Sequence, residues 1–566
     1  MGTIAAGART RAFWFAALCG AVLISRWALF PHYLITFDEI NFALAIDRFD
    51  PRLHQPQAPG YPLFVALLKL LSHCTRRVEV TFLTASVLLS VAALLLLWRL
   101  GNLMSCSGVA SATAPSQNVP AGTSDEIQTM PNRAATASER TQRACFQWSA
   151  MQLGNLVASR QTGILAALLL LFNPTFWLGG LIGTVRLCFA VGAIAVALCG
   201  WKACVDKSAR WLAIGAGVLG LASGARPALA LLMAPLLIWV AWRIRLPWKA
   251  ALFAVLCFGA AVATWLPPLI LASGGCRSYL GMLSIYSQNQ IAGTSVLFGA
   301  ALYKGLRMGG YAVAWSCLGT LSWIWAVPLI MRKGGRVFDS FTATFLALWF
   351  FPGLLFYATF HVANPDHTLS IVPATCVAGA LVIAALTADM QRARRITICA
   401  LCVLLNLFLF FKPITKTTKP CTYTPIKWMS GYVGDVIDGV RSLEGQGPVT
   451  AVFAEAITGW RQLSYYDPAA HIVVLMKSKP GELVTRHISG RRIEIERVGT
   501  GAAELPSCGV IAWVDPRLPP SVSNGTSLQS IHSRIFFARA TPGQSFQYHG
   551  ATFTATADCG KSAAGY

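Results

Sequence analysis

Two adjacent carboxylates, Asp38 and Glu39, follow the first hydrophobic segment of the chain. A carboxylate can take a proton from a hydroxyl group, and a neighbouring carboxylate alters its pKa through like-charge repulsion. An acidic pair beside the membrane surface of an otherwise apolar chain therefore predicts a role in catalysis. The alternative interpretation is a pair of solvated carboxylates at the interface, without a chemical role.

The segment before these acids, residues 12–30, is apolar or small except for Arg26. About 19 helical residues, with a rise of about 1.5 Å each, are long enough to cross a bilayer. Arg9 and Arg11 precede the segment. Because positive charge is retained on the cytoplasmic side, we expect the N-terminus inside and the acids outside. The segment lacks a small-residue cleavage site, which favours a retained anchor over a removed signal peptide.

The composition predicts a polytopic membrane protein. Of 566 residues, 55% are hydrophobic and 12% are charged, and the mean hydropathy is +0.56. These values exclude a soluble globular protein. The net charge is +23, but Lys and Arg occur in short clusters between apolar segments. We interpret the clusters as topology signals and expect no binding to nucleic acid.

Hydropathy and charge bias predict about eleven transmembrane helices. They are residues 12–30, 80–98, 162–180, 185–201, 211–223, 227–242, 250–271, 311–331, 338–357, 369–386 and 396–411. An odd number of crossings places the chain after residue 411 outside. Two long external loops, 31–79 and 273–310, are expected to contain interfacial helices. Residues 62–71 are apolar but too short to span the membrane, which suits a helix that lies along its surface.

The chain is expected to have two domains. Residues 1–412 would form the transmembrane domain, and residues 413–566 would form a small soluble α/β domain on the external or periplasmic side. The second domain regains charged residues and contains β-rich runs at 448–453 and 471–475. Within the first, residues 101–160 are rich in Ser, Ala, Thr and Gln and predict a disordered cytoplasmic insert.

Cysteine and glycine patterns give weaker signals. Cys508 and Cys559 lie in the external domain, where a disulfide is possible, and their pairing is left open. The glycines from Gly215 to Gly220 match a dinucleotide-binding pattern, but they fall inside a predicted membrane helix. We therefore interpret Gly220 and Gly224 as sites of close helix packing.

The loop after the acidic pair contains a His- and Pro-rich stretch, residues 54–62, that leads into the predicted surface helix. This order of features resembles the glycosyltransferase C superfamily, which includes protein mannosyltransferases and aminoarabinose transferases. Residues 173–177, 223–227 and 364–369 fit the same resemblance, which extends over residues 12–412. It implies a membrane enzyme that transfers a hexosyl or pentosyl group from a polyprenyl-phosphate donor to a lipid, glycan or protein acceptor. We expect the location to be the external face of a bacterial inner membrane.

The resemblance also implies roles for individual residues. Asp38, as the first acid, would be the general base, because an unassisted alcohol is a poor nucleophile at neutral pH. Glu39 would orient the acceptor, alter the pKa of its neighbour or help to bind a metal ion. Arg226, at an external hairpin, would bind the lipid phosphate; the alternative is an arginine that extends from a helix end to the interface. Further cationic candidates are Arg186, Arg277, Lys304 and Arg307.

Other polar residues in the external loops are candidates for substrate binding. They are His54, Gln57, Tyr61, Tyr279, His361, Asp366 and His367. A histidine there could bind phosphate, donate a hydrogen bond to a sugar or ligate a metal, and the alternative is ordinary loop packing. Asp47 and Asp50 are expected to be surface charges or helix caps. The spacing gives no complete set of metal ligands, so a cofactor such as a divalent metal ion is left open.

Two other classes of function are considered. A solute transporter also has many spans, but carriers usually place ionisable residues at mid-membrane in broken helices and often have repeated halves. Here the predicted spans contain almost no Asp or Glu, and no internal repeat is evident. The third class is a non-catalytic assembly or sensor protein whose soluble domain binds a partner. We favour the glycosyltransferase over both.

Overall fold

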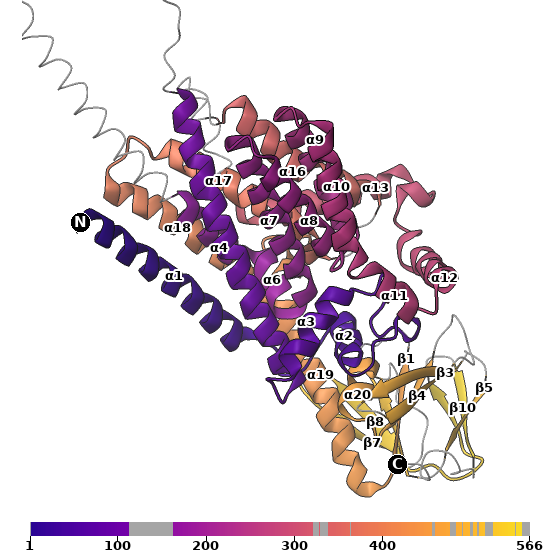
Figure 1. The fold of residues 1–566 in the computed structure, drawn as a ribbon. Coiled ribbons are helices and arrows are strands. Elements are labelled where there is room, and N and C mark those ends of the chain that lie inside the picture. The colour runs from indigo at the N-terminus through magenta and orange to yellow at the C-terminus, as the bar shows by residue number, and fades with distance from the viewer. Residues whose placement is uncertain are drawn as a thin grey trace, which may run out of the picture.

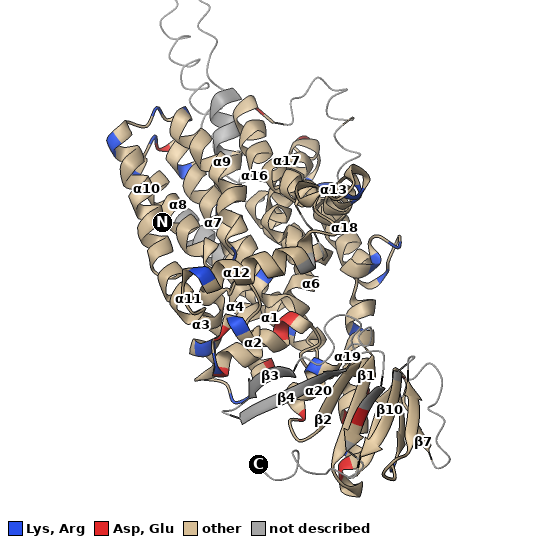
Figure 2. Cartoon of the chain, turned by 90° about the vertical axis from the view of Figure 1, so that its right-hand side faces the viewer, with Lys and Arg blue, Asp and Glu red and all other residues tan. Residues whose placement is uncertain are grey.

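The computed structural model describes residues 2–112, 162–320, 328, 338–360, 362, 364–454, 459–475, 483–488, 491–498, 502–506, 509–515, 525–548 and 551–556. A long bundle of helices lies above a smaller part built on β-strands (Figure 1). Charged side chains gather toward the ends of the bundle and leave its middle largely uncharged (Figure 2). This distribution is typical of a chain whose middle layer is surrounded by lipid.

The described part of the bundle contains sixteen α-helices that bear on the fold. They are α1 (Gly2–Leu29), α2 (Phe37–Asp47), α3 (Pro62–Ser72), α4 (Val78–Ala112), the helix Thr162–Leu171, α6 (Pro174–Ile182), α7 (Thr184–Val205), α8 (Ala209–Ser223), α9 (Ala228–Arg243), α10 (Trp248–Ala263), α11 (Leu266–Ala272), α12 (Cys276–Tyr286), α13 (Leu302–Cys317), α16 (Ser340–Thr359), α17 (Val372–Leu386) and α18 (Arg392–Phe411). Two short 3-10 helices also matter for the site, η1 (Pro51–Leu53) and η5 (Pro365–Ser370).

Six helices of the described residues are long and apolar enough to cross a membrane. They lie in α1, α4, α7, α10 with α11, α16 and α18. The helix Thr162–Leu171 and α6 form a seventh span if they are counted together, with a bend of 54° between them. The shorter apolar helices α8, α9 and α17 coincide with three further predicted spans. The prediction of eleven crossings is compatible with this arrangement.

Close helix packing explains the glycines of α8. A methyl group at Gly220 would come within 2.6 Å of the carbonyl oxygen of Phe258 in α10, and one at Gly224 within 2.8 Å of the side chain of Leu63 in α3. The neighbour of Gly220 is backbone and cannot move away, whereas the neighbour of Gly224 is the end of a side chain. The prediction of close helix approach is therefore confirmed at Gly220, and at Gly224 it stays a prediction.

Arg26 is the one basic residue in the first predicted span, and its side chain is fully buried. Its Nη2 atom donates to the backbone oxygen of Phe176 at 3.4 Å, and its guanidinium lies 5.5 Å from the centre of that ring. Gly180 leaves the space that the guanidinium fills, since a methyl group there would overlap its Nε. Arg26 thus joins α1 to α6 inside the bundle.

The C-terminal part is an α/β unit whose central sheet has seven strands in the order β3-β4-β2-β1-β6-β8-β7. A second sheet has the order β5-β10-β9. The strands are β1 (Val449–Ala454), β2 (His471–Leu475), β3 (Leu483–Ile488), β4 (Arg491–Val498), β5 (Ala502–Pro506), β6 (Val510–Val514), β7 (Thr526–Gln529), β8 (Arg534–Ala538), β9 (Ser545–Tyr548) and β10 (Ala551–Thr556). The β-rich runs predicted at 448–453 and 471–475 form β1 and β2, which pair in parallel. The predicted fold class, a polytopic helical membrane protein with a small C-terminal α/β unit, is confirmed.

Two helices join this unit to the bundle. They are α19 (Tyr423–Leu443), which follows the last span, and α20 (Trp460–Tyr466), which connects β1 to β2. Apolar side chains of α19 and of the sheet form one buried cluster that also includes Ile35 and, from α6, Trp177 and Leu181. The core of the α/β unit is therefore continuous with the core of the membrane part.

Several predictions lie wholly or partly outside the described residues. They concern Cys508 and Cys559, His361, and the predicted insert at 101–160 beyond residue 112. The described beginning of that insert, residues 101–112, continues the helix α4.

We predict that Asp38 is accessible from the external side of the membrane. A cysteine introduced there, in a variant that lacks the exposed Cys74 and Cys276, should react with a membrane-impermeant maleimide on intact cells. The reason is the positive-inside bias of the sequence, which predicts a cytoplasmic N-terminus for α1. Labelling only after the cells are permeabilised would contradict this topology.

Candidate active site

Helix α2 begins at Phe37 because Thr36 and Glu39 form a capping box. The Thr36 hydroxyl accepts from the Glu39 backbone N–H at 3.2 Å, and the Thr36 backbone N–H donates to Glu39 Oε2 at 3.0 Å. Reciprocal bonds of this kind satisfy two backbone N–H groups that a helix start leaves unpaired. Asp38 therefore projects from the first turn of a helix whose start is firmly defined.

Glu39 is the buried member of the acidic pair. The residue is only 3% exposed. Its Oε2 atom also accepts hydrogen bonds from the Thr36 hydroxyl at 2.9 Å and from the Ile35 N–H at 3.2 Å. Burial raises the pKa of Glu39 to about 8, and the hydrogen bonds from Thr36 and Ile35 oppose this only in part. Glu39 is thus the buried partner of Thr36 in the capping box of α2. Its role in orienting an acceptor stays a prediction.

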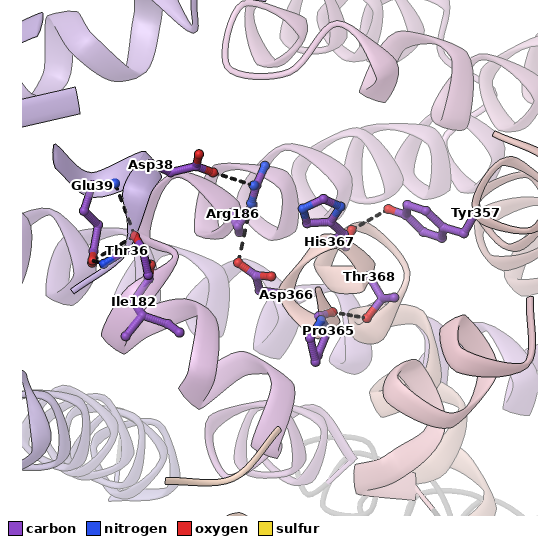
Figure 3. A network of polar contacts seen from close by, with 10 residues as sticks. All are labelled: Thr36, Asp38, Glu39, Ile182, Arg186, Tyr357, Pro365, Asp366, His367 and Thr368. Atoms are coloured by element: carbon purple, nitrogen blue, oxygen red, sulfur yellow. Dashed lines mark hydrogen bonds and ion pairs between the residues drawn. The ribbon is translucent and has the colours of Figure 1, made fainter. Parts of the chain in front are cut away.

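Asp38 faces a buried arginine from another helix (Figure 3). Nη2 of Arg186, in the first turn of α7, donates to Asp38 Oδ2 at 2.9 Å. Nε of Arg186 also lies 3.5 Å from Asp366 Oδ2, in η5. The Arg186 and Asp366 side chains are 8% exposed and that of Asp38 is 36% exposed. One guanidinium therefore joins two carboxylates, of which Asp38 is the accessible one.

The chain turn at Gly183 makes this arrangement possible. Gly183 lies between α6 and α7, and a methyl group there would overlap the Asp366 carboxylate. The missing side chain lets η5 approach the start of α7. Burial raises the pKa of Asp366, and the charge of Arg186 opposes that shift.

Arg186 separates two cavities. The smaller, about 410 Å³, contains Asp38, Asp366 and Asn364 and is closed by residues of the C-terminal segment, Pro420, Pro425, Ile426 and Met429. The larger, about 810 Å³, is mostly apolar and is lined by residues of α9, α12 and α16 among others. Arg186 lines both. The guanidinium of Arg186 is thus shared by the walls of both cavities.

Several polar residues line the larger cavity together with Arg186. They are Tyr61, Arg226, Tyr279, Tyr286 and His367. Arg226 stacks its guanidinium on Phe189 at 4.6 Å, and its Nη1 is a buried donor without a hydrogen-bond partner among the described residues. Unpaired buried donors cost free energy, so this atom is suited to an anionic ligand.

Two consecutive residues of η5 line different cavities. Asp366 lines the smaller and His367 the larger. Tyr357 of α16 fixes this turn, because its hydroxyl donates to the His367 carbonyl at 2.5 Å and lies 2.8 Å from the Ser370 hydroxyl (Figure 3). The predicted pair Asp366 and His367 is therefore brought to the same place as Asp38 and Arg226.

Other predicted residues are placed elsewhere. His54 is exposed and lines neither of these two cavities. Gln57 is buried and accepts a hydrogen bond from Asn41 at 3.2 Å. Tyr279 donates to the carbonyl of Pro59 at 3.3 Å and lines the larger cavity. Asp50 caps η1 and pairs with Arg52 at 2.9 Å, as predicted for a capping residue.

The lesser cationic candidates divide in the same way. Arg186 is central, whereas Arg277 is exposed on α12. Lys304 donates to the carbonyl of Gly293 at 3.0 Å, and Arg307 donates to the Tyr311 hydroxyl at 2.8 Å. Among the residues that the structure describes, no group of three His, Cys, Asp or Glu side chains could hold a metal ion.

Two residues of the site are not evident from local sequence. Arg186 is among the lesser cationic candidates, since nothing local shows that it meets Asp38 and Asp366. Tyr286 is not among the predicted residues; it lines the larger cavity, and burial raises its pKa to about 12. For Glu39 a signal was present, because Thr36 followed three residues later by Glu is a capping box.

Comparisons with known proteins bear on the fold. Residues 51–247 match the family model described as the Protein O-mannosyl-transferase TMEM260 N-terminal domain. This range is less than half of the chain and begins after Asp38. No curated protein matches the sequence.

The fold is similar to two solved structures of ArnT from Cupriavidus metallidurans. The structure bound to undecaprenyl phosphate matches with a TM-score of 0.53 at 10% identity, over 94% of this chain and 98% of that chain. The apo structure matches with a TM-score of 0.50 at 10% identity, over the same shares. The chain thus has the fold of these ArnT structures. Together with the family match, this fold supports a membrane glycosyltransferase of the glycosyltransferase C type and confirms the resemblance drawn from the first loop.

We predict that Glu39 makes the protein less stable as the pH rises. Its pKa is about 8 in the folded state and near the ordinary glutamate value of about 4.5 in the unfolded state. Between these values the folded state binds a proton that the unfolded state has lost, so raising the pH favours unfolding. Thermal unfolding in detergent at several pH values should show a smaller pH dependence for Glu39→Gln than for the wild type.

The matched control is Glu504→Gln, which changes an exposed carboxylate. It should retain the pH dependence of the wild type. If the unfolding temperature changed equally with pH in all three proteins, the assignment of Glu39 as a buried, largely protonated member of the capping box would be contradicted.

Proposed function

We propose that the chain transfers one sugar from a polyprenyl-phosphate donor to an acceptor hydroxyl on the external side of the membrane. The acceptor oxygen forms a bond to the anomeric carbon while the bond from that carbon to the phosphate oxygen breaks. Asp38 takes the hydroxyl proton, and polyprenyl phosphate leaves. A single displacement of this kind inverts the anomeric configuration.

The observation that carries this proposal is that Asp38 lines the smaller cavity and pairs with Arg186, which lines both cavities. It is the accessible carboxylate of the Arg186 pair, and its helix start is fixed by Thr36 and Glu39. A general base must reach the proton that it removes, so an accessible, oriented carboxylate is suited to the task. Asp366, more deeply buried on the same guanidinium, would keep Arg186 in position.

The larger cavity is the proposed donor site. Its walls include Leu231, Leu283, Leu355 and Phe356, which suit an isoprenoid chain, and they also include Arg226 and Arg186. Two guanidinium groups can stabilise the charge that grows on the phosphate as the glycosidic bond breaks. The similar ArnT structure is bound to undecaprenyl phosphate, which supports a lipid-linked donor here.

The smaller cavity is the proposed acceptor site, because Asp38 lines it and the α/β unit closes it. Lipid, glycan and protein hydroxyl groups are all possible acceptors. The name of the matched family makes mannose and a protein hydroxyl the first pair to test.

The rival function is a solute carrier. The acidic residues of this site come from α2 and η5, which are not among the helices suited to cross the membrane, whereas carriers place them at mid-membrane. Solute uptake by vesicles that contain no lipid-linked sugar would favour the carrier instead.

We predict that Asp38→Asn lowers kcat by about 10²- to 10⁴-fold, the usual contribution of a general base. Asparagine keeps the shape of the side chain but cannot take the proton. The measurement is sugar transfer in membranes, followed by mass spectrometry of the lipid-linked donor. Asp47→Asn, at the exposed end of the same helix, is the control and should keep wild-type activity. Undiminished transfer by Asp38→Asn would refute the proposal.

We predict that Arg226→Ala raises the KM for the donor about tenfold, which corresponds to about 1.4 kcal/mol of lost binding. Arg226→Lys should recover part of it, because a lysine keeps the charge but not the paired hydrogen bonds. Arg277→Ala, which removes an exposed arginine of α12, is the control. An unchanged KM for Arg226→Ala would show that the phosphate binds elsewhere.

A further inference from the structure

Helix α20 of the α/β unit lies against the segment that leads into α2. Its side chains meet the backbone of this segment at two places. Nε2 of Gln462 donates to the carbonyl oxygen of Ile35 at 2.8 Å, and the Leu34 N–H donates to the Tyr466 hydroxyl at 2.8 Å. Gln462, Leu34 and Ile35 are all buried. Two residues remote in sequence thus bind the chain just before Asp38.

Ile35 is bound on both sides. Its N–H donates to Glu39 Oε2 at 3.2 Å, inside the capping box, and its carbonyl oxygen accepts from Gln462. The Ile35 side chain belongs to the apolar cluster shared by α19 and the sheet. The residue that connects the α/β unit to the capping box is therefore fixed through its N–H, its carbonyl oxygen and its side chain.

The same helix also reaches the first turns of α2. The guanidinium of Arg461 stacks on the ring of Phe37, the residue before Asp38, and its Nη1 lies 3.4 Å from Asn41 Oδ1. Tyr466 packs edge-on against Tyr33 with ring centres 5.0 Å apart. Contacts from α20 therefore bracket Asp38 along the chain, from Tyr33 to Asn41.

We infer that Gln462 and Tyr466 are positioning residues that set the place of Asp38, so that the α/β unit takes part in the transfer reaction. This inference rests on the proposed function, because it needs Asp38 to be the base. Neither residue touches the reacting groups; each acts through the backbone of Leu34 and Ile35. Helix α2 starts immediately after these residues, so a change in their backbone moves the first turn that bears Asp38.

Geometry of this kind affects rate more than binding. A displacement of about 1 Å in a reacting group can lower a rate by about 100-fold. The donor contacts lie in the larger cavity, whose lining does not include residues 34–36. Loss of the Gln462 or Tyr466 contact should therefore lower kcat and leave the donor KM unchanged.

The test is a double-mutant cycle on the full chain in membranes. Gln462→Ala and Tyr466→Phe are made in the wild type and in Asp38→Glu, which keeps a carboxylate but moves it by one methylene. In the wild type each change should lower kcat about tenfold or more, with an unchanged donor KM. In Asp38→Glu the same change should have almost no further effect, because the base is already displaced. The control is Gln547→Ala, which changes an exposed glutamine on β9. It should leave kcat unchanged in both backgrounds.

Folding is checked separately by the amount of protein in membranes and by thermal unfolding in detergent. A merely structural role would lower activity by the same factor in both backgrounds, in parallel with the amount of folded protein, and that result would overturn the inference. An unchanged kcat for both variants would overturn it as well. Full activity of Asp38→Asn would instead reject the proposed function, so the two failures are distinguishable.

Discussion

The buried guanidinium of Arg186 is the interaction on which the site depends. It pairs with Asp38 from α2 and with Asp366 from η5, and it comes from the first turn of α7. A buried charge is tolerated only when it is paired, and removing one partner leaves the others uncompensated. The three elements are therefore fixed relative to one another by charge as well as by packing. Because Asp38 is the most exposed of the three groups, it is the one that a substrate can reach.

The same guanidinium separates the two cavities. On one side lie the two carboxylates and the wall formed by the C-terminal segment, and on the other lie Arg226 and the long apolar cavity. A site at which a proton is removed and a phosphate departs must stabilise opposite changes in charge within a few ångströms. A cation between a base and an anionic leaving group is arranged before the reaction, so it needs no reorganisation as the charges develop.

Local features of the sequence predicted much of this arrangement. The apolar periodicity, the charge clusters and the acidic pair after the first span predicted a polytopic membrane fold with Asp38 near its surface. The β-rich runs predicted the α/β unit. The pairing of Arg186 with Asp38 and Asp366 could not be predicted, because it joins three elements far apart in the chain and depends on the missing side chain of Gly183. The contact of Gln462 with Ile35 is equally non-local. For Glu39, the capping-box spacing was present, but the resemblance directed attention to catalysis.

The α/β unit was expected as a second domain on the external side, and the sequence left its role open. Its buried cluster includes Ile35 and Trp177, and its leading segment closes the cavity that contains Asp38. Apolar burial of this extent is the main favourable term in association of two parts. The unit is thus part of the structure that surrounds the site, whatever further contacts it makes with an acceptor.

A structure of the full chain in lipid nanodiscs with a bound polyprenyl-phosphate sugar tests the central claim most directly. The account predicts that the phosphate contacts Arg226 in the larger cavity and that the anomeric carbon faces Asp38 beside Arg186. A phosphate bound in the smaller cavity, or an anomeric carbon on the far side of Arg186 from Asp38 and out of its reach, would contradict it.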